Sequence, residues 1–237
     1  MFRRMFGWLL MGFALAALPL QAGELDAQLL AAAHQGDVAE ASRLLEAGAD
    51  VNKAHRPWNL TPLLVSVGVS EAMTDLLLRA GADINAKERE GVTVLMKAVH
   101  GGKPKVVERL LAEPGLMVDT SGPRGNTALT YAILYGHAEM VEMLVDHGAD
   151  VNVARANGTT PKAIADHMHG LALAMPASQA GHEHHRHHGM RGHAMRSRDQ
   201  AVASYSRVLA TLDGSGAEHK PQQCHHDRAG QGGQHHH

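Results

Sequence analysis

The chain has 237 residues, a formal net charge of −2 at pH 7 and one cysteine. This length allows one or two domains, the charge argues against bulk nucleic-acid binding, and a lone cysteine excludes an internal disulfide. With only 3% aromatic residues, the core must be built from Leu, Val, Ala and Met.

Residues 1–22 have the pattern of a secretory signal. Arg3 and Arg4 supply a positive start, the stretch from Phe6 to Leu20 is apolar, and Ala22 offers a small residue for cleavage. The apolar stretch is shorter than the roughly 20 residues that a spanning helix needs, although an uncleaved membrane anchor is the alternative. We therefore expect an exported, periplasmic protein without a membrane span after signal removal.

Residues 24–170 contain an internal repeat with a period near 33. One element is the pentapeptide GADVN or GADIN, and a second element in the same register is a Thr followed by Pro or a small residue. The pentapeptides are Gly48–Asn52, Gly81–Asn85 and Gly148–Asn152, and the threonines are Thr61, Thr93, Thr127 and Thr160.

Each element of the repeat has a structural role. The Thr hydroxyl can accept from free N–H groups at a helix start. Small residues such as Ala98 and Ala132 keep this first helix thin, so that neighbouring units can stack. A Gly near the middle turns the chain back, and the Gly of the pentapeptide suits the left-handed cap of a second helix.

The pattern resembles the ankyrin repeat, whose signature combines a TPLH-type helix start with a period near 33. The resemblance implies an all-α solenoid of about four to five helix-turn-helix units with protruding turns, and protein binding without catalysis. Three departures occur: the TPLH-type histidine is absent, the second unit is one residue short between its helices, and Pro114–Met117 replaces a Gly-Ala-Asp. The first unit lacks the Thr start, as expected of a capping repeat.

A fifth unit begins at Thr160, but no partner helix follows directly. Residues 199–214 are amphipathic, with Tyr205 and Leu209 on the apolar stripe. We predict that this segment is the displaced outer helix of the fifth unit, with residues 171–198 inserted as a His- and Met-rich disordered loop, and that Tyr205 and Leu209 are buried against the fourth unit. The alternative is that the repeats end near Gly170 and a disordered tail follows. Residues 215–237 are expected to be a disordered His-rich tail.

The stretch Gly181–Met195 contains six histidines and two methionines in fifteen residues. Neutral imidazole binds Zn, Cu and Ni, and a thioether suits Cu(I). A second group of ligands lies in the tail, where a frayed terminus or an intermolecular disulfide of the cysteine are alternatives. Because neither segment has the spacing of a closed structural site, we expect weak, exchangeable binding of Ni, Cu or Zn, and no required cofactor. The candidate ligands are His182, His184, His185, His187, His188 and His193, followed by Cys224, His225 and His226.

The repeats predict a partner-binding surface on the inner helices and the protruding turns. Tyr, Trp and Arg are favoured anchors at interfaces, and three of the four aromatic residues after the signal fall at these places. The tyrosines could instead pack between repeats. The predicted partner-binding residues are Arg56, Trp58, Lys97, His100, Tyr131 and Tyr135.

The sequence contains no nucleophile elbow, no phosphate-binding glycine loop and no paired carboxylates on a predicted scaffold, so we expect no enzyme. Two functions are therefore considered. The first is a monomeric periplasmic adaptor that binds an unidentified protein partner and no nucleic acid. The second is a periplasmic metal buffer or metal chaperone that acts through the His-rich loop.

Overall fold

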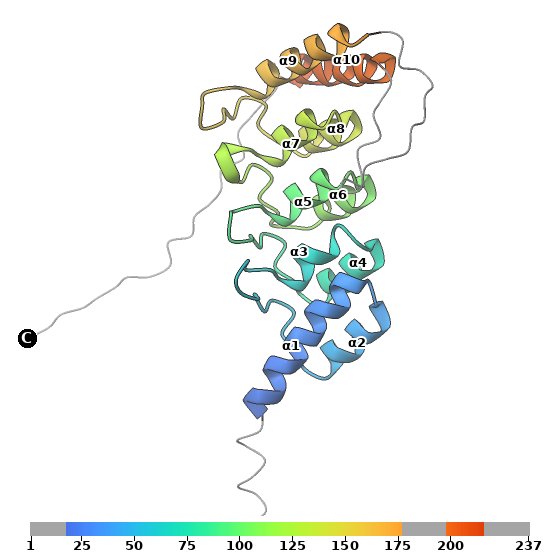
Figure 1. Cartoon of the computed structure of the whole chain (residues 1–237), viewed down its shortest axis with the longest axis vertical. Helices are drawn as coiled ribbons and strands as arrows, with labels where there is room; N and C mark the ends of the chain where they lie inside the picture. Colours follow the sequence, from blue (N-terminus) through green and yellow to red (C-terminus); the bar gives the residue numbers. More distant parts are fainter. Residues whose placement is uncertain (1–17, 177–197, 216–237) are drawn as a thin grey trace, which may run out of the picture.

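The helices of this protein stack in antiparallel pairs (Figure 1). The computed structural model describes residues 18–176 and 198–215, with side chains for residues 23–176 and 198–214. The helices are α1 (Leu18–Gln35), α2 (Val38–Glu46), α3 (Pro62–Ser66), α4 (Glu71–Arg79), α5 (Val94–His100), α6 (Pro104–Leu111), α7 (Ala128–Leu134), α8 (Ala138–Asp146), α9 (Pro161–Ala174) and α10 (Arg198–Ser215), with a short 3-10 turn, η1 (Pro123–Gly125).

The odd-numbered helices form an inner row and the even-numbered helices an outer row. Each helix packs against its antiparallel partner and against the equivalent helix of the next unit. Within the described part of the chain the structure contains no strand, only two isolated β-bridges, His55 with Leu60 and Lys87 with Thr93. The predicted all-α solenoid is confirmed.

Four inner helices begin as the sequence predicts. The hydroxyls of Thr61, Thr93, Thr127 and Thr160 each accept from the backbone N–H three residues later, at 3.2 to 3.3 Å. A cap of this kind stabilises a helix by about 1 kcal/mol. The repeated threonines therefore set where each inner helix starts.

The asparagine of the pentapeptide connects successive units. Asn52 Oδ1 accepts from the N–H of Asp83 at 2.7 Å, and Asn52 Nδ2 donates to the carbonyl of Gly81 at 3.1 Å. Asn85 makes the same pair of bonds to Met117 and Gly115, both at 2.9 Å. The departure at Pro114–Met117 therefore preserves the connection between units.

At the start of the stack no pentapeptide turn precedes α1, and a residue of α1 itself makes the corresponding bond to the turn after α2. Asp26 in α1 is 4% exposed, and its carboxylate accepts from the N–H of Asp50 at 2.8 Å. Asp119 does the same for Asp150 at 3.0 Å. An acidic residue therefore replaces the asparagine at two levels of the stack, because a carboxylate oxygen accepts as well as an amide oxygen does.

One hydrophobic core runs through all units, and it consists mainly of Leu, Val, Ala and Met as predicted. Leu44, Leu77, Leu110 and Leu144 occupy the same place on successive outer helices, and all four are fully buried. Ala98 and Ala132 on the inner helices are fully buried too, so the inner row is thin enough for close stacking.

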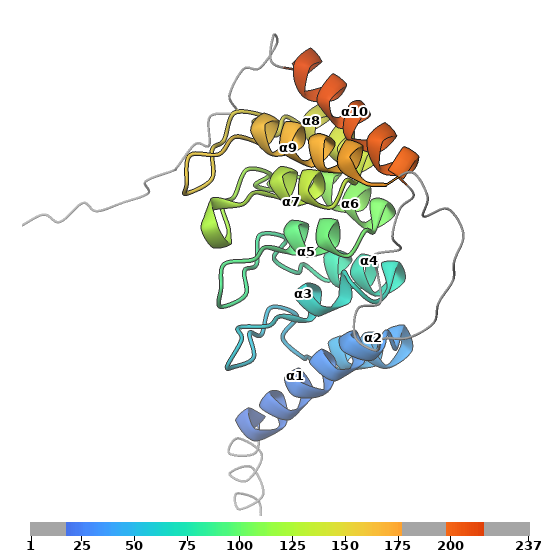
Figure 2. The ribbon, with the colours of Figure 1, turned by 45° about the horizontal axis from the view of Figure 1, so that its top comes forward.

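The two helices of the last pair are longer than α2 to α8 and lie across the end of the stack (Figure 2). Tyr205 is 7% exposed, and its hydroxyl donates to the carbonyl of Leu134 at 3.3 Å. Val208 and Leu212 join the main core, and Leu209 packs against it. The expected burial is therefore found for Tyr205, whereas Leu209 is only partly buried. Helix α10 packs against α8 and α9, in the place of a fifth outer helix.

The boundaries of this unit differ from the expectation. Helix α9 continues to Ala174, so residues 171–174 are helical although the sequence places them in the loop. The physical reason is a second small cluster of Ala172, Ala201 and Tyr205, which pairs the extended ends of α9 and α10. Most of the predicted signal, residues 1–17, lies outside the described residues. Among the helices described, none combines the length and apolar character that a bilayer crossing requires.

Candidate protein interaction surface

Four turns protrude from the same side of the stack, each directly before an inner helix (Figures 1 and 2). We call them fingers 1 to 4, residues 53–60, 86–92, 120–126 and 153–159, and together the finger row. The inner helices α3, α5, α7 and α9 start where the fingers end. The finger row and the exposed sides of these helices therefore form one extended surface.

Hydrogen bonds join finger 1 to finger 2 and finger 3 to finger 4. The N–H of Arg89 donates to the carbonyl of Trp58 and Asn59 Nδ2 donates to the carbonyl of Lys87, both at 2.8 Å. The N–H of Ala156 donates to the carbonyl of Arg124 at 3.0 Å. Because these bonds limit the movement of one finger relative to the next, the surface loses little conformational entropy when a partner binds.

Trp58 at finger 1 is the most prominent apolar side chain on this surface. It is 56% exposed, and it lines a cleft of about 340 Å³ with Leu60, Arg89 and Lys97. Lys97 extends from α5 to this cleft and forms an ion pair with Glu88 of finger 2, with Nζ 2.9 Å from Oε2. The indole thus combines a large apolar face with charged neighbours, as is common at protein interfaces.

A second cleft of about 430 Å³ lies between α1, α3 and α5. Leu60 and Lys97 line both clefts, so the two clefts are adjacent. The lining of the second cleft also includes His34, Val69 and His100. We call the two adjacent clefts together the groove; it includes Trp58 on the finger row and residues of the inner helices.

Next to this groove lies a cluster of rings from two units. The ring centroids of His100 and Tyr135 are 4.8 Å apart in an edge-to-face arrangement, and the Tyr135 hydroxyl lies 3.5 Å from His100 Nε2. Tyr131 stacks on Tyr135 with centroids 6.4 Å apart, and Tyr135 stacks on His137 at 6.0 Å. Both tyrosines are partly exposed, so they pack between repeats and also present ring area to solvent.

The structure thus brings the predicted partner-binding residues onto one face, in two groups. Trp58 and Lys97 share a cleft, and His100 contacts Tyr131 and Tyr135. Arg56 is exposed on finger 1. Sequence reasoning missed Leu60 and Val69, because nothing in an isolated finger or turn indicates that its apolar residue lines a groove between units.

The candidate metal ligands His182–His193 and Cys224–His226 lie outside the described residues. The histidines described within the repeats make ordinary contacts, such as His147 Nδ1 with the carbonyl of Met143 at 2.8 Å and His169 Nε2 with the Ser206 hydroxyl at 3.1 Å. In the described part of the chain no three His, Cys, Asp or Glu side chains gather as a metal site would require.

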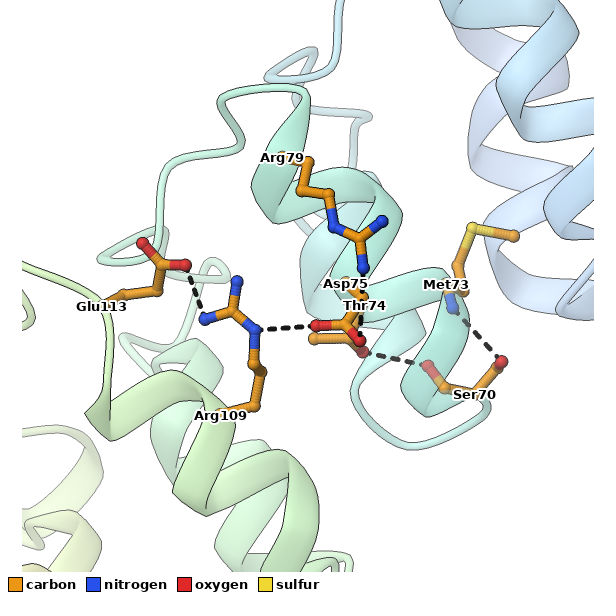
Figure 3. A network of polar contacts seen from close by, with 7 residues as sticks. All are labelled: Ser70, Met73, Thr74, Asp75, Arg79, Arg109 and Glu113. Carbon is orange, nitrogen blue, oxygen red and sulfur yellow. Dashed lines mark hydrogen bonds and ion pairs between the residues drawn. The ribbon is translucent and has the colours of Figure 1, made fainter.

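The opposite face has a different character. Between α4 and α6, Arg109 Nε contacts Asp75 at 2.7 Å and Arg109 contacts Glu113 at 2.6 Å, while Arg79 reaches the same Asp75 at 3.8 Å (Figure 3). The hydrogen bond to Glu113, and then the bond to Asp75, raise the pKa of Arg109 above its ordinary value. Here the cations are paired with carboxylates, and the pair of Arg109 with Asp75 joins two units.

The fold and this surface define a class, the all-α repeat proteins whose stacked helix pairs leave an extended face open to partners. The family profile described as "Ankyrin repeats (3 copies)" matches residues 65–155.

Several curated proteins are similar to this chain. YahD of Escherichia coli (strain K12), named as an ankyrin repeat protein, is 30% identical over 128 residues, which cover 52% of this chain and 63% of YahD. The mitochondrial disaggregase of Bos taurus is 32% identical over 139 residues, which cover 57% of this chain and 20% of that protein. The ankyrin repeat domain-containing protein SAT10 of Stachybotrys chartarum is 45% identical over 86 residues, 36% of this chain and 4% of SAT10. The chain thus spans less than two thirds of each of these relatives.

The chain contains ankyrin repeats, and its fold is an all-α ankyrin solenoid. Ankyrin repeats are interaction modules, so the groove and finger row are the place to look for a protein partner.

Proposed function

We propose that this protein is an adaptor that captures a protein partner on the groove and finger row, and that it works in the periplasm after removal of residues 1–22. The observation that carries the proposal is Trp58, which is 56% exposed and lines one of the two adjacent clefts of the groove. A large exposed apolar side chain in a preorganised groove is the arrangement that concentrates binding energy at interfaces. We further propose that the protein is monomeric and has no catalytic activity of its own.

The test compares capture of a partner by the full chain and by two triple variants. Trp58→Ala/Tyr131→Ala/Tyr135→Ala removes the aromatic side chains of the groove side. Glu71→Ala/Glu108→Ala/Glu139→Ala changes three exposed positions on the outer helices and serves as the control. We expect the first variant to lose a partner, identified by mass spectrometry of envelope extracts, that the wild type and the control retain.

Because Tyr131 and Tyr135 are partly buried, a second measurement separates binding from folding. A photo-crosslinking amino acid placed at Trp58 should form a covalent adduct with the partner in living cells, and the same group placed at Glu108 should not. Equal retention by the two triple variants, together with no crosslink at Trp58, would refute the proposal.

A second candidate function rests on the composition of Gly181–Met195, with six histidines and two methionines in fifteen residues. We propose that this segment binds Ni, Cu or Zn weakly, because neutral imidazole and thioether are ligands for these ions. Isothermal titration of the full chain and of a variant lacking residues 178–196 tests this, at pH 7.5 and pH 5.5. Binding that weakens at the lower pH and disappears with the deletion supports the metal function, and binding that is indifferent to the deletion contradicts it.

A further inference from the structure

The finger row carries cations that no carboxylate of the described residues neutralises. Among the contacts described, Lys53 is the one finger cation with a carboxylate partner, Asp26 at 3.9 Å. The finger row has two acidic residues: Glu88 is paired with Lys97, and Glu90 forms no ion pair in the described part of the chain. Within the described residues, five finger cations form no ion pair: Arg56, Lys87, Arg89, Arg124 and Arg155.

The outer helices show the reverse distribution. Arg43, Arg79 and Arg109 are all paired with carboxylates, and Lys105 is the one outer-helix cation of α2 to α8 that forms no ion pair in the described part of the chain. Carboxylates without an ion pair to any described residue remain there in excess, namely Glu46, Glu71, Glu108, Glu139 and Asp146. The net charge of −2 therefore conceals a molecule that is basic along the fingers and acidic along its back.

The spacing of these cations is set by the stacking of the repeats. Every finger contributes at least one of them, and adjacent packed helices lie about 8–10 Å apart. An extended peptide advances about 3.3 Å per residue, so every third residue of such a peptide advances about 10 Å. A carboxylate at every third position would thus meet one finger after another, and arginine can hold a carboxylate through two parallel hydrogen bonds.

The backbone of finger 3 supports a binding role. Arg124 has a φ of +61°, in the left-handed region that residues other than glycine rarely adopt, and Gly125 follows with a φ of +75°. The Arg124 side chain is exposed and forms no ion pair within the described residues. Strained backbone that holds an exposed side chain without an internal partner is a feature of ligand-binding positions.

Resting on the proposed adaptor function, we propose that the finger row binds an extended acidic segment of the partner protein, with carboxylates at about every third residue and an apolar side chain next to Trp58. Fingers 1 to 4 hold the carboxylates, and the acidic outer helices repel the same segment. The partner is thereby directed to one face, because electrostatic complementarity selects orientation.

The probe is a fluorescein-labelled peptide with glutamates at every third position, separated by Ser and Ala, with one Leu near its end. A permuted peptide has the same composition with its glutamates adjacent. Binding to the full chain is measured by fluorescence anisotropy. The finger variant is Arg56→Gln/Arg89→Gln/Arg124→Gln, and the control variant, with the same change in charge, is Arg43→Gln/Arg79→Gln/Lys105→Gln. Circular dichroism checks that both variants fold.

We expect the finger variant to bind the spaced peptide about tenfold more weakly than wild type, and the control variant to bind it as wild type does. The permuted peptide should bind several-fold more weakly than the spaced one, and raising the salt from about 50 to about 200 mM should weaken binding. Equal loss in both variants, or equal affinity for both peptides, would mean general charge attraction and overturn the proposal. A single-stranded oligonucleotide is added as a competitor at a phosphate concentration equal to the carboxylate concentration of the peptide. If it displaces the spaced peptide, the proposal is overturned in favour of a nucleic acid.

Failure of the acidic-segment proposal can be distinguished from failure of the adaptor proposal. If the partner still crosslinks at Trp58 but the finger variant retains both partner and peptide, the adaptor function stands and the acidic recognition fails. If neither the crosslink nor the peptide binding is found, both fail.

Discussion

The assignment of α10 as the fifth outer helix is tested by one substitution made at two places. Leu212 in α10 is 4% exposed, and Leu173 in α9 is 47% exposed, although both belong to the same helix pair. Leu→Ala removes the same atoms at each position, so the difference between the two variants reports burial alone.

The expected magnitudes follow from exposure. Full burial of a Leu side chain is worth about 1.5–3 kcal/mol, and the cavity left by truncation increases the loss, so Leu212→Ala should cost about 2–4 kcal/mol. About half of the Leu173 side chain is already exposed to solvent in the folded protein, so the same change there should cost less than about 1 kcal/mol. For a chain of this size the Leu212 variant should melt about 5–12 °C lower, and the Leu173 variant within about 3 °C of wild type.

The assay is thermal melting followed by circular dichroism, combined with hydrogen exchange. Since each unit of a solenoid contacts only its neighbours, the Leu212 variant should also lose exchange protection first in α8 and α9 and last in α3 and α4. If Leu212→Ala destabilises the protein no more than Leu173→Ala, α10 does not cover the fourth unit, and the reasoning is refuted.

Three further predictions concern stability. Asn85→Ala removes both side-chain hydrogen bonds between the second and third units and should lower the free energy of unfolding by about 2 kcal/mol in a denaturant titration. Asn157→Ala removes one local bond to the N–H of Thr159 and should cost about half as much. Equal losses would contradict a role of Asn85 in joining units. Arg124→Gly should relieve the strain of the left-handed backbone and raise the free energy of unfolding by about 1 kcal/mol, while it weakens binding of the acidic peptide. A loss of stability would show that the backbone at Arg124 is not strained. The hydrogen bonds from Arg43 lower the pKa of Glu40. The stabilisation is therefore present above the unfolded-state pKa of about 4.3 and is lost as the pH falls through the lower folded-state pKa. The gap in melting temperature between wild type and Glu40→Gln should narrow as the pH falls below about 4.3, and a gap that widens on acidification would contradict this sign.

Much of the candidate surface could be anticipated residue by residue. The repeat places Trp58 on a finger and Lys97 and the two tyrosines on inner helices, and the structure agrees, with Tyr135 as the C-cap of α7. The groove could not be anticipated, because Leu60 and Lys97 come from different units and line the same clefts only when the units stack. The expectations for the signal, the periplasmic location and the metal ligands concern residues or conditions that the described structure does not reach, and they stay predictions.

The sequence by itself determined the units: where inner helices begin, where outer helices end, and which asparagine joins one level to the next. These features depend on hydrogen bonds and backbone angles within a few residues or one repeat, so the residue type specifies them directly. The tertiary structure decided which cations remain unpaired and where the last unit closes. Ion pairs such as Arg109 with Asp75 join residues 34 positions apart, and α10 returns to α8 after a long insertion. Such contacts depend on the stacking of whole units, which no local pattern encodes.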